Sequence, residues 1–184
     1  MVLMTGASNL LMMYLSLEFV SITSYVMAGL LPRNRKSAEA SLKYIIYGAG
    51  ASGMMIYGMS FLYGLTGTLQ IAEIGRALAA DPVSPMKALL ISTLVMAGFG
   101  YKIAAAPFHM WCPDVYQGAP TPVTAFFSVG PKAAGFAMLV RFVAGVFHTT
   151  GPEGAFDWRL VLAILAVLTM AVGNFGALQQ QNLK

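Results

Sequence analysis

The sequence predicts an all-α fold, a polytopic bundle of transmembrane helices. Of its 184 residues, 58% are hydrophobic and only 10% are charged, whereas about a quarter of the residues of a soluble domain carry charge. The apolar residues form several runs close to the roughly 20 residues that cross a bilayer as a helix. Short polar or proline-containing segments separate these runs, which predicts several crossings.

We expect a single transmembrane domain over 1–184. Its spans, one partial and five full, are predicted at about 1–6, 10–31, 40–64, 88–106, 122–147 and 158–178. Pro32 is expected to end the first full span, and Ser37 followed by Glu39 to open the next. The first residues lack the features of a signal peptide and the last ones lack a helix cap, which predicts an internal piece of a larger membrane protein.

The loop at 32–37 predicts the orientation of the chain. It holds the strongest positive cluster in the sequence, formed by Arg33, Arg35 and Lys36. By the positive-inside rule this loop is cytoplasmic. The charges of the connection at 66–87 cancel, as an outer loop allows. Counting spans from there places the connection at 109–120 and Lys184 on the cytoplasmic side as well.

The composition excludes several classes of function. Cys112 is the single cysteine, which excludes an internal disulfide and a cysteine-cluster metal site. The two histidines, His109 and His148, are too few for a metal site without carboxylates. The net charge of +4 is scattered and forms no basic stripe for nucleic acid. Without a phosphate-binding loop or a nucleophile beside a base, the chain is expected to carry no metal, no cofactor and no redox or hydrolytic chemistry of its own.

Four ionisable residues lie inside or at the edge of the predicted spans: Glu18, Lys43, Lys102 and Lys132. A lysine at the centre of a spanning helix costs roughly 2.5–3.5 kcal/mol, whereas each leucine returns about 0.3–0.6 kcal/mol. Such residues face a bundle interior or a water-filled path, and are functional by default. We interpret the four as a charge relay, with structural ion pairs between helices as the alternative.

Lys102 is the deepest of the four and lies just before a predicted break. Pro107 removes a backbone donor and prevents one straight helix from carrying both Lys102 and His109. Such a break is tolerated at membrane depth where it is buried in protein or lines a wet cavity. The lysine and the freed carbonyls therefore suit a proton path, which the pKa of a histidine also suits. Lys132 follows Pro131 and is expected beside a second helix irregularity.

Glu18 belongs to a polar stripe on one helix face, formed by Tyr14, Glu18, Ser21 and Tyr25. A carboxylate at that depth needs a cationic partner, or it becomes protonated. Lys43 lies near a span end, where snorkelling of its side chain explains it as well as function does. Asp114 and Tyr116 are assigned first to capping and turn roles in their connection.

The stretch KIAAAPFHMWCPDVYQGAPTPVTAF at 102–127 resembles the antiporter-like, proton-pumping membrane subunits of NADH-quinone oxidoreductase (respiratory complex I). These are relatives of the subunits of multi-subunit cation/proton antiporters, and share a lysine followed by P-F-H-x-W-x-P-D and A-P-T-P-V. The form P-D-V-Y-Q-G-A-P at 113–120 is similar to the subunit N group, as are LEFVSITSYVMAGL and GNFGALQQQNLK.

The resemblance implies a fold of two inverted five-helix repeats, each with a broken helix, of which this chain holds about one. It also implies residue roles. Glu18 matches a glutamate of the fifth transmembrane helix, and Lys43 a lysine near the start of the sixth. Lys102 matches the proton-carrying lysine of the broken seventh helix, Lys132 the lysine of the eighth, and His109 the motif histidine. In the family, the glutamate and a lysine partner form a pair that tunes the pKa of the central lysine.

The implied function is that of a non-redox, proton-translocating subunit in the inner membrane of a bacterium. No catalysis is expected of the isolated chain. NADH, FMN, Fe–S clusters and quinone are expected in the parent complex, and the partners are other membrane-arm subunits and the bilayer. Two alternatives remain open. One is a subunit of a cation/proton antiporter or a membrane-bound hydrogenase, against which the V-Y-Q-G form argues, and the other is a structural spacer.

Overall fold

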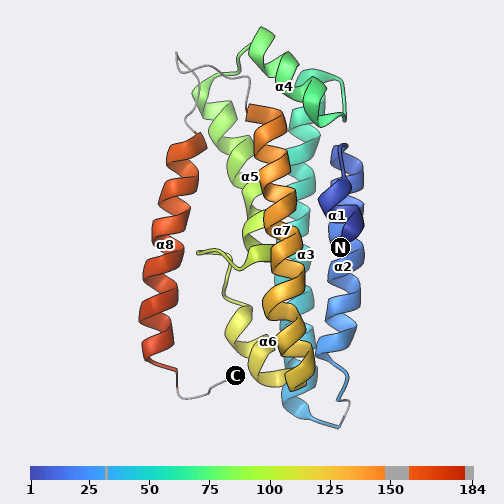
Figure 1. The fold of residues 1–184 in the computed structure, drawn as a ribbon, viewed down its shortest axis with the longest axis vertical. Coiled ribbons are helices and arrows are strands. Elements are labelled where there is room, and N and C mark those ends of the chain that lie inside the picture. The colour runs from blue at the N-terminus through green and yellow to red at the C-terminus, as the bar shows by residue number, and fades with distance from the viewer. Residues whose placement is uncertain (32, 148–157, 181–184) are drawn as a thin grey trace.

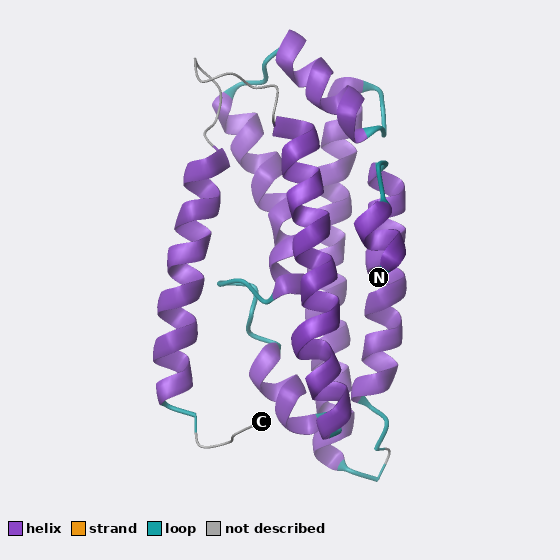
Figure 2. Cartoon of the chain, viewed as in Figure 1, coloured by secondary structure: helices purple, strands orange, loops and turns teal. Residues whose placement is uncertain are grey.

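The computed structural model describes residues 1–31, 33–147 and 158–180. Within them the chain forms helices and no strand (Figure 2). The helices are α1 (Val2–Gly6), α2 (Leu10–Ala28), α3 (Arg35–Thr66), α4 (Ile71–Ala80), α5 (Pro85–Ile103), α6 (Cys112–Gly118), α7 (Thr121–Phe147) and α8 (Trp158–Leu178). Five of them, namely α2, α3, α5, α7 and α8, are long and apolar enough to cross a membrane. The prediction of an all-α transmembrane bundle is confirmed.

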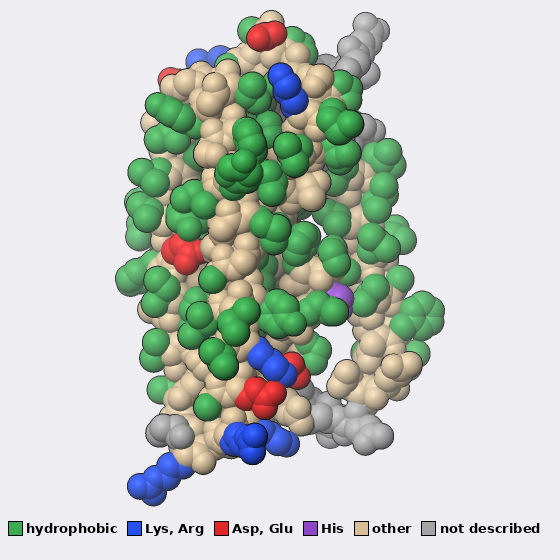
Figure 3. All heavy atoms as spheres, turned by 180° about the vertical axis from the view of Figure 1, so that it is seen from behind, with side chains coloured by type: hydrophobic (Ala, Val, Ile, Leu, Met, Phe, Trp, Pro, Cys, Tyr) green, Lys and Arg blue, Asp and Glu red, His purple; other side chains and the backbone are tan. Residues whose placement is uncertain are grey.

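Helices α2, α3, α5 and α7 run side by side as an upright bundle (Figure 1). Helix α8 stands beside the bundle, and none of the residues 159–178 is buried. Large apolar side chains cover the outside of the spanning helices. Figure 3 shows these side chains over the middle of one face, with most lysines and arginines toward its two ends. This distribution suits a bilayer around the middle of the bundle.

Two spans have ends that differ from the expected ones. Helix α3 begins at Arg35, five residues before position 40, because the side chain of Asn34 accepts a hydrogen bond from the backbone N–H of Lys36. Helix α2 ends at Ala28, three residues before position 31, and the N–H of Gly29 caps it. Pro32, the expected end of this span, lies outside the described residues.

The connection expected as an outer loop contains α4. Its apolar residues recur on one face, so that Ile71, Ile74 and Leu78 are buried against the bundle. Gly75 allows this close approach, because a Cβ atom there would collide with the carbonyl oxygen of Gly145 in α7. A helix of 10 residues is too short to be recognised as a span, which is why the search for spans missed it.

The predicted break is present, but it begins earlier than expected. Helix α5 ends at Ile103 rather than near position 106, and Ala104 adopts a left-handed conformation with φ 59°. Pro107 follows, with a cis peptide bond before it, and the chain becomes helical again at Cys112. A proline clashes with the carbonyl four positions earlier and disfavours helix at the residue before it, which explains the early end.

The second proline, Pro131, lies inside a helix. Helix α7 runs through Pro131 without a break, so any irregularity beside Lys132 is smaller than the one at Pro107. A helix tolerates a proline in its interior when the loss of one hydrogen bond is compensated by packing, and Pro131 is buried. The lysine therefore projects from a continuous helix.

The two ends of the bundle differ in what they carry. The turn between α2 and α3, helix α6 and the end of α8 lie at one end, and α4 lies at the other (Figure 1). This agrees with the sidedness obtained by counting spans, while the cytoplasmic assignment of the loop at 32–37 stays a prediction. The polar turn at 149–157, His148 and Lys184 lie outside the described residues.

Candidate functional site

Lys102 lies in the last turn of α5, directly before the break. Only 2% of the residue is exposed, and its Nζ donates a hydrogen bond to Ser21 Oγ of α2 over 3.0 Å. Helix α7 covers the stem of the lysine, since a Cβ atom at Gly135 would lie 3.3 Å from Lys102 Cγ. Three helices therefore enclose the lysine, and a hydroxyl oxygen receives its polar end.

Glu18 lies on α2 about one turn from Ser21 and is half-buried. Its carboxylate accepts a hydrogen bond from the hydroxyl of Ser52 in α3. Neither of the two ion pairs among the described residues includes Glu18. The pair between this glutamate and a lysine, which the resemblance implies, is therefore not formed within the described part of the chain.

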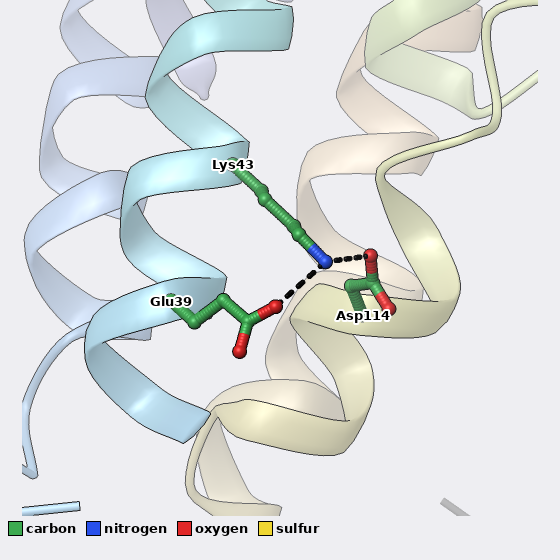
Figure 4. Close-up of polar contacts among 3 residues, drawn as sticks. All are labelled: Glu39, Lys43 and Asp114. Carbon is green, nitrogen blue, oxygen red and sulfur yellow. Dashed lines mark hydrogen bonds and ion pairs between the residues drawn. The ribbon is translucent and has the colours of Figure 1, made fainter. Parts of the chain in front are cut away.

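Lys43 lies in a different group, near the start of α3. Its Nζ forms ion pairs with Glu39 Oε1 at 2.8 Å and with Asp114 Oδ2 at 2.7 Å (Figure 4). Its side chain is 37% exposed. Ser52, which marks the level of Glu18, is nine residues further along α3, or about 13 Å. Asp114, assigned above to capping, thus joins α6 to α3 through an ion pair.

A cavity of about 510 Å³ lies beside the break, lined by six residues between Ala104 and Tyr116, by Lys132 and by one side of α8. Lys132 Nζ lies 5.3 Å from the centre of the Tyr116 ring, a cation–π contact. His109 Nδ1 and the Tyr116 hydroxyl are buried and have no hydrogen-bond partner among the described residues. Unpaired polar atoms beside a cavity bind water when the cavity is large enough to hold it. A cavity of this volume is large enough.

Two side chains of α6 on this cavity stay neutral. Burial raises the pKa of the Cys112 thiol and of the Tyr116 phenol. Both groups therefore keep their protons at neutral pH and act as neutral dipoles beside Lys132. No three His, Cys, Asp or Glu side chains in the described ranges converge on a point that could hold a metal ion.

The structure thus distributes the five candidate residues over three places. Lys102 and Glu18 lie at the junction of α2, α3 and α5, and His109 and Lys132 line the cavity. Lys132 and Gly135 are three residues apart on α7, and Gly135 packs against Lys102, so only about one helical turn separates these two places. Lys43 lies apart, toward the end of the bundle that holds α6.

Sequence reasoning missed three polar partners. Ser52 donates to Glu18, Asp114 pairs with Lys43, and Thr169 of α8 accepts the backbone N–H of Ala106 at the break over 3.0 Å. Ser52 and Thr169 can be noticed in the sequence, because each is a hydroxyl residue within an apolar span. Asp114 could not be found in this way, because it lies 71 residues from its partner.

Spanning helices, a break at membrane depth and an almost fully buried lysine beside it define an α-helical membrane protein of the transporter type. The chain belongs to the family described as "NADH:quinone oxidoreductase/Mrp antiporter, TM", whose model matches residues 7–184. It is a multi-pass protein of a bacterial inner membrane.

Several relatives with curated names match the whole chain. It is 51% identical to "NADH-quinone oxidoreductase subunit N 2" of Chloroherpeton thalassium, covering 100% of this chain and 36% of the relative. It is 50% identical to "NADH-quinone oxidoreductase subunit N" of an Anaeromyxobacter species, covering 100% of this chain and 39% of the relative. The chain thus spans less than two fifths of the length of these relatives.

Solved structures show the same fold. Respiratory complex I from Thermus thermophilus with bound aureothin contains a chain that matches with a TM-score of 0.79 and 37% identity, covering 99% of this chain and 37% of that one. The Mrp complex from a Dietzia species matches with a TM-score of 0.78 and 25% identity, covering 94% of this chain and 31% of that one.

Proposed function

We propose that this chain is part of a subunit N of a proton-translocating NADH-quinone oxidoreductase, and that it holds a proton path. The curated relatives that cover the whole chain at about half identity carry that name. The observation that carries the proposal is Lys102, a buried lysine beside a break in its helix. A site of this kind is expensive in a membrane and is found where protons or ions move.

Lys102 is suited to bind and release a proton. Its hydrogen-bond partner is a hydroxyl, which accepts from an ammonium and donates to a neutral amine. No carboxylate of the described residues lies within ion-pair distance of Lys102 to hold it charged. Its proton affinity therefore depends on charges further away, of which Glu18 is one.

The cavity beside the break is the second part of the proposed path. His109 and Lys132 line it, and Lys132 lies within about one helical turn of the Lys102 level. A proton released by Lys102 would pass to water in this cavity and on to Lys132. Lys43 and its two carboxylates lie toward the proposed cytoplasmic end, where they take part in proton uptake.

In this proposal the subunit does no redox chemistry. Quinone reduction takes place in other subunits, which hold the FMN and the Fe–S clusters, and its energy reaches this subunit as a change of charge along the membrane arm. The other membrane-arm subunits are the partners of this chain, and the loop at 32–37 faces the cytoplasm.

The test is the substitution Lys102→Ala in the full-length parent subunit, assembled in its complex in inverted membrane vesicles. We expect proton uptake driven by NADH to fall while native gels show normal assembly. Lys87→Ala is the matched control, because Lys87 belongs to the same helix and is exposed. Normal proton uptake by the assembled Lys102→Ala complex would refute the proposal.

Cation/proton antiport is the second candidate, because the chain matches the Mrp complex almost as well in fold as it matches complex I. The sequence identity favours complex I, at 37% against 25%. A sodium gradient imposed on the vesicles distinguishes the two functions. If the chain belongs to an antiporter, this gradient drives proton movement without NADH, whereas proton movement by complex I requires NADH.

A further inference from the structure

Gly48 of α3 faces two tyrosine hydroxyls. A Cβ atom at this position would collide with the Tyr25 hydroxyl and would lie 2.8 Å from the Tyr101 hydroxyl. Two side chains from different helices, α2 and α5, therefore direct their polar ends at one point on α3. The absence of a side chain at Gly48 is what leaves room for both.

These hydroxyls continue the hydrogen bond of Lys102. Lys102 Nζ donates to Ser21 Oγ over 3.0 Å, and Tyr25 follows Ser21 by about one turn on the same face of α2. The Ser21 hydroxyl itself donates to the backbone carbonyl of Leu17 over 2.7 Å. The Tyr101 hydroxyl donates to the backbone carbonyl of Tyr44 over 2.9 Å. Three hydroxyls thus lie close together beside the buried lysine, and those of Ser21 and Tyr101 donate to backbone carbonyls.

The row of hydroxyls leads toward one end of the bundle. Tyr25 lies about one turn beyond Ser21 on α2, toward the end where α2 meets α3. On α3, Tyr44 lies about one turn from Gly48 toward Arg35 and is adjacent to Lys43. The hydroxyls therefore lead from Lys102 toward the end of the bundle that holds Lys43.

Aromatic packing shields this route from the outside. Tyr25, Tyr44 and Tyr101 are all buried, and the Trp111 ring stacks on Tyr44 with 4.5 Å between centroids. The Trp111 Nε1 also donates to the backbone carbonyl of Tyr101 over 3.0 Å. With little room for bulk water on this side of Lys102, the hydroxyls are the groups available to carry a proton.

We propose that Ser21, Tyr25 and Tyr101 form a hydroxyl chain that passes protons to Lys102 from the end of the bundle near Lys43, and that Gly48 is its positioning residue. The proposal rests on the proton path proposed above. In each step a hydroxyl oxygen accepts a proton and releases its own to the next group, for which the hydroxyls of Ser21 and Tyr101 turn away from the carbonyls of Leu17 and Tyr44. Water at the Lys43 end supplies the first proton.

Gly48→Ala tests the positioning role in the full complex. The atoms that the new methyl group meets are the hydroxyl ends of two side chains and not backbone, so the hydroxyls are displaced first. Gly50→Ala is the matched control, because it adds the same methyl group to the same helix with nothing within 4 Å. We expect the rate of proton uptake in inverted vesicles to fall for Gly48→Ala and to be unchanged for Gly50→Ala.

The size of the effect follows from the chemistry. A positioned proton-transfer group contributes about 10²–10⁴ in rate, and we expect a loss of at least about tenfold, since Gly48→Ala displaces the hydroxyls without removing them. The solvent deuterium isotope effect on proton uptake should rise in Gly48→Ala, because proton transfer becomes slower relative to the other steps. A merely structural glycine would not change this isotope effect.

Two further comparisons keep the test decisive where Gly48→Ala does not assemble. Tyr101→Phe removes one hydroxyl and leaves the ring, and should reproduce the loss. Ser21→Ala should also reproduce it, whereas Ser21→Thr keeps the oxygen and should restore uptake. If the assembled Tyr101→Phe and Ser21→Ala complexes pump normally while Lys102→Ala does not, the hydroxyl chain is refuted and the proton path remains. If Lys102→Ala itself pumps normally, both are refuted.

Discussion

Lys102 Nζ and Ser21 Oγ are 3.0 Å apart, and this hydrogen bond joins the deepest charge of the bundle to a neutral hydroxyl rather than to a carboxylate. A buried lysine that served only to hold helices together would be expected to pair with an acid, because an ion pair offsets the cost of burial. The hydroxyl instead serves both the charged and the neutral lysine. The proposed proton-carrying role of Lys102 and the structural alternative therefore predict different effects on stability.

Replacing Lys102 with methionine should not destabilise the bundle. Methionine has a similar volume and needs no polar partner, so the cost of burying an ammonium group is removed. Ser21→Ala, in contrast, leaves the lysine without its acceptor and should cost about 1–3 kcal/mol. The thermal midpoint of the purified parent subunit in lipid nanodiscs measures both. A larger loss for Lys102→Met than for Ser21→Ala would show that the lysine is structural.

The ion pair between Lys43 and Asp114 should contribute little to stability. The side chain of Lys43 is 37% exposed and that of Asp114 is 48% exposed, and pairs in such positions contribute about 0.2–1 kcal/mol. A double-mutant cycle with Lys43→Met and Asp114→Asn measures the coupling energy. The charge swap Lys43→Asp with Asp114→Lys should restore only part of it, because the new carboxylate at position 43 is repelled by Glu39. A coupling energy well above this range would mean that the pair holds α6 in place, and would favour the structural alternative.

The sequence predicted the spanning helices well because each is an apolar run bounded by a polar turn, and both signals are local. The ends of α7 and α8 lie within a residue of the expected positions for this reason. Helix α3 begins early because a side-chain cap at Asn34 extends it into charged residues, which a hydropathy argument places in a loop. Helix α4 was missed because its apolar face, and not its average composition, defines it.

The candidate site was predicted as a set of residues but not as an arrangement. Burial cost alone identifies Lys102, since a lysine in an apolar run must face the protein interior. The partner of Glu18 depends on how far α2 and α3 are displaced along one another, and this register brings Ser52 and not a lysine to it. Such displacement is decided by packing between helices distant in sequence, which no local pattern contains.

Gly118→Ala should loosen α6 from α3. A Cβ atom at Gly118 would collide with the backbone carbonyl oxygen of Lys36 and would lie 2.6 Å from the Ala40 Cβ. These atoms belong to a helix backbone and to a short side chain and cannot move aside, so we expect a loss of about 1–3 kcal/mol. Gly64→Ala is the control, with nothing within 4 Å of the new atom. The thermal midpoints of the two variants give the comparison, and equal values would contradict the close contact.

Thr169→Val should weaken the attachment of α8 at the break. Thr169 Oγ1 accepts the backbone N–H of Ala106, and the isosteric valine leaves this donor unpaired at a cost of about 1–3 kcal/mol. Amide hydrogen exchange of the peptide that contains Ala106 should become faster in the purified parent complex. Thr169→Ser keeps the oxygen and should retain the slow exchange. Unchanged exchange in Thr169→Val would show that another acceptor replaces the threonine.

Cys112 should react slowly with maleimide at neutral pH. Burial raises the pKa of its thiol above the ordinary value, and the reactive form is the thiolate. The fraction of thiolate at pH 7 is therefore below that of an exposed cysteine, and the reaction should accelerate as the pH rises into the alkaline range.

The thiol lines the cavity beside the break, so a bulky side chain there, as in Val172→Trp, should slow the reaction further at every pH. Mass spectrometry of the Cys112 peptide after timed labelling gives the rate, and Val167→Trp, at an exposed position of α8 that does not line the cavity, is the control. Equal rates in both variants would mean that the reagent reaches Cys112 by a route other than this cavity.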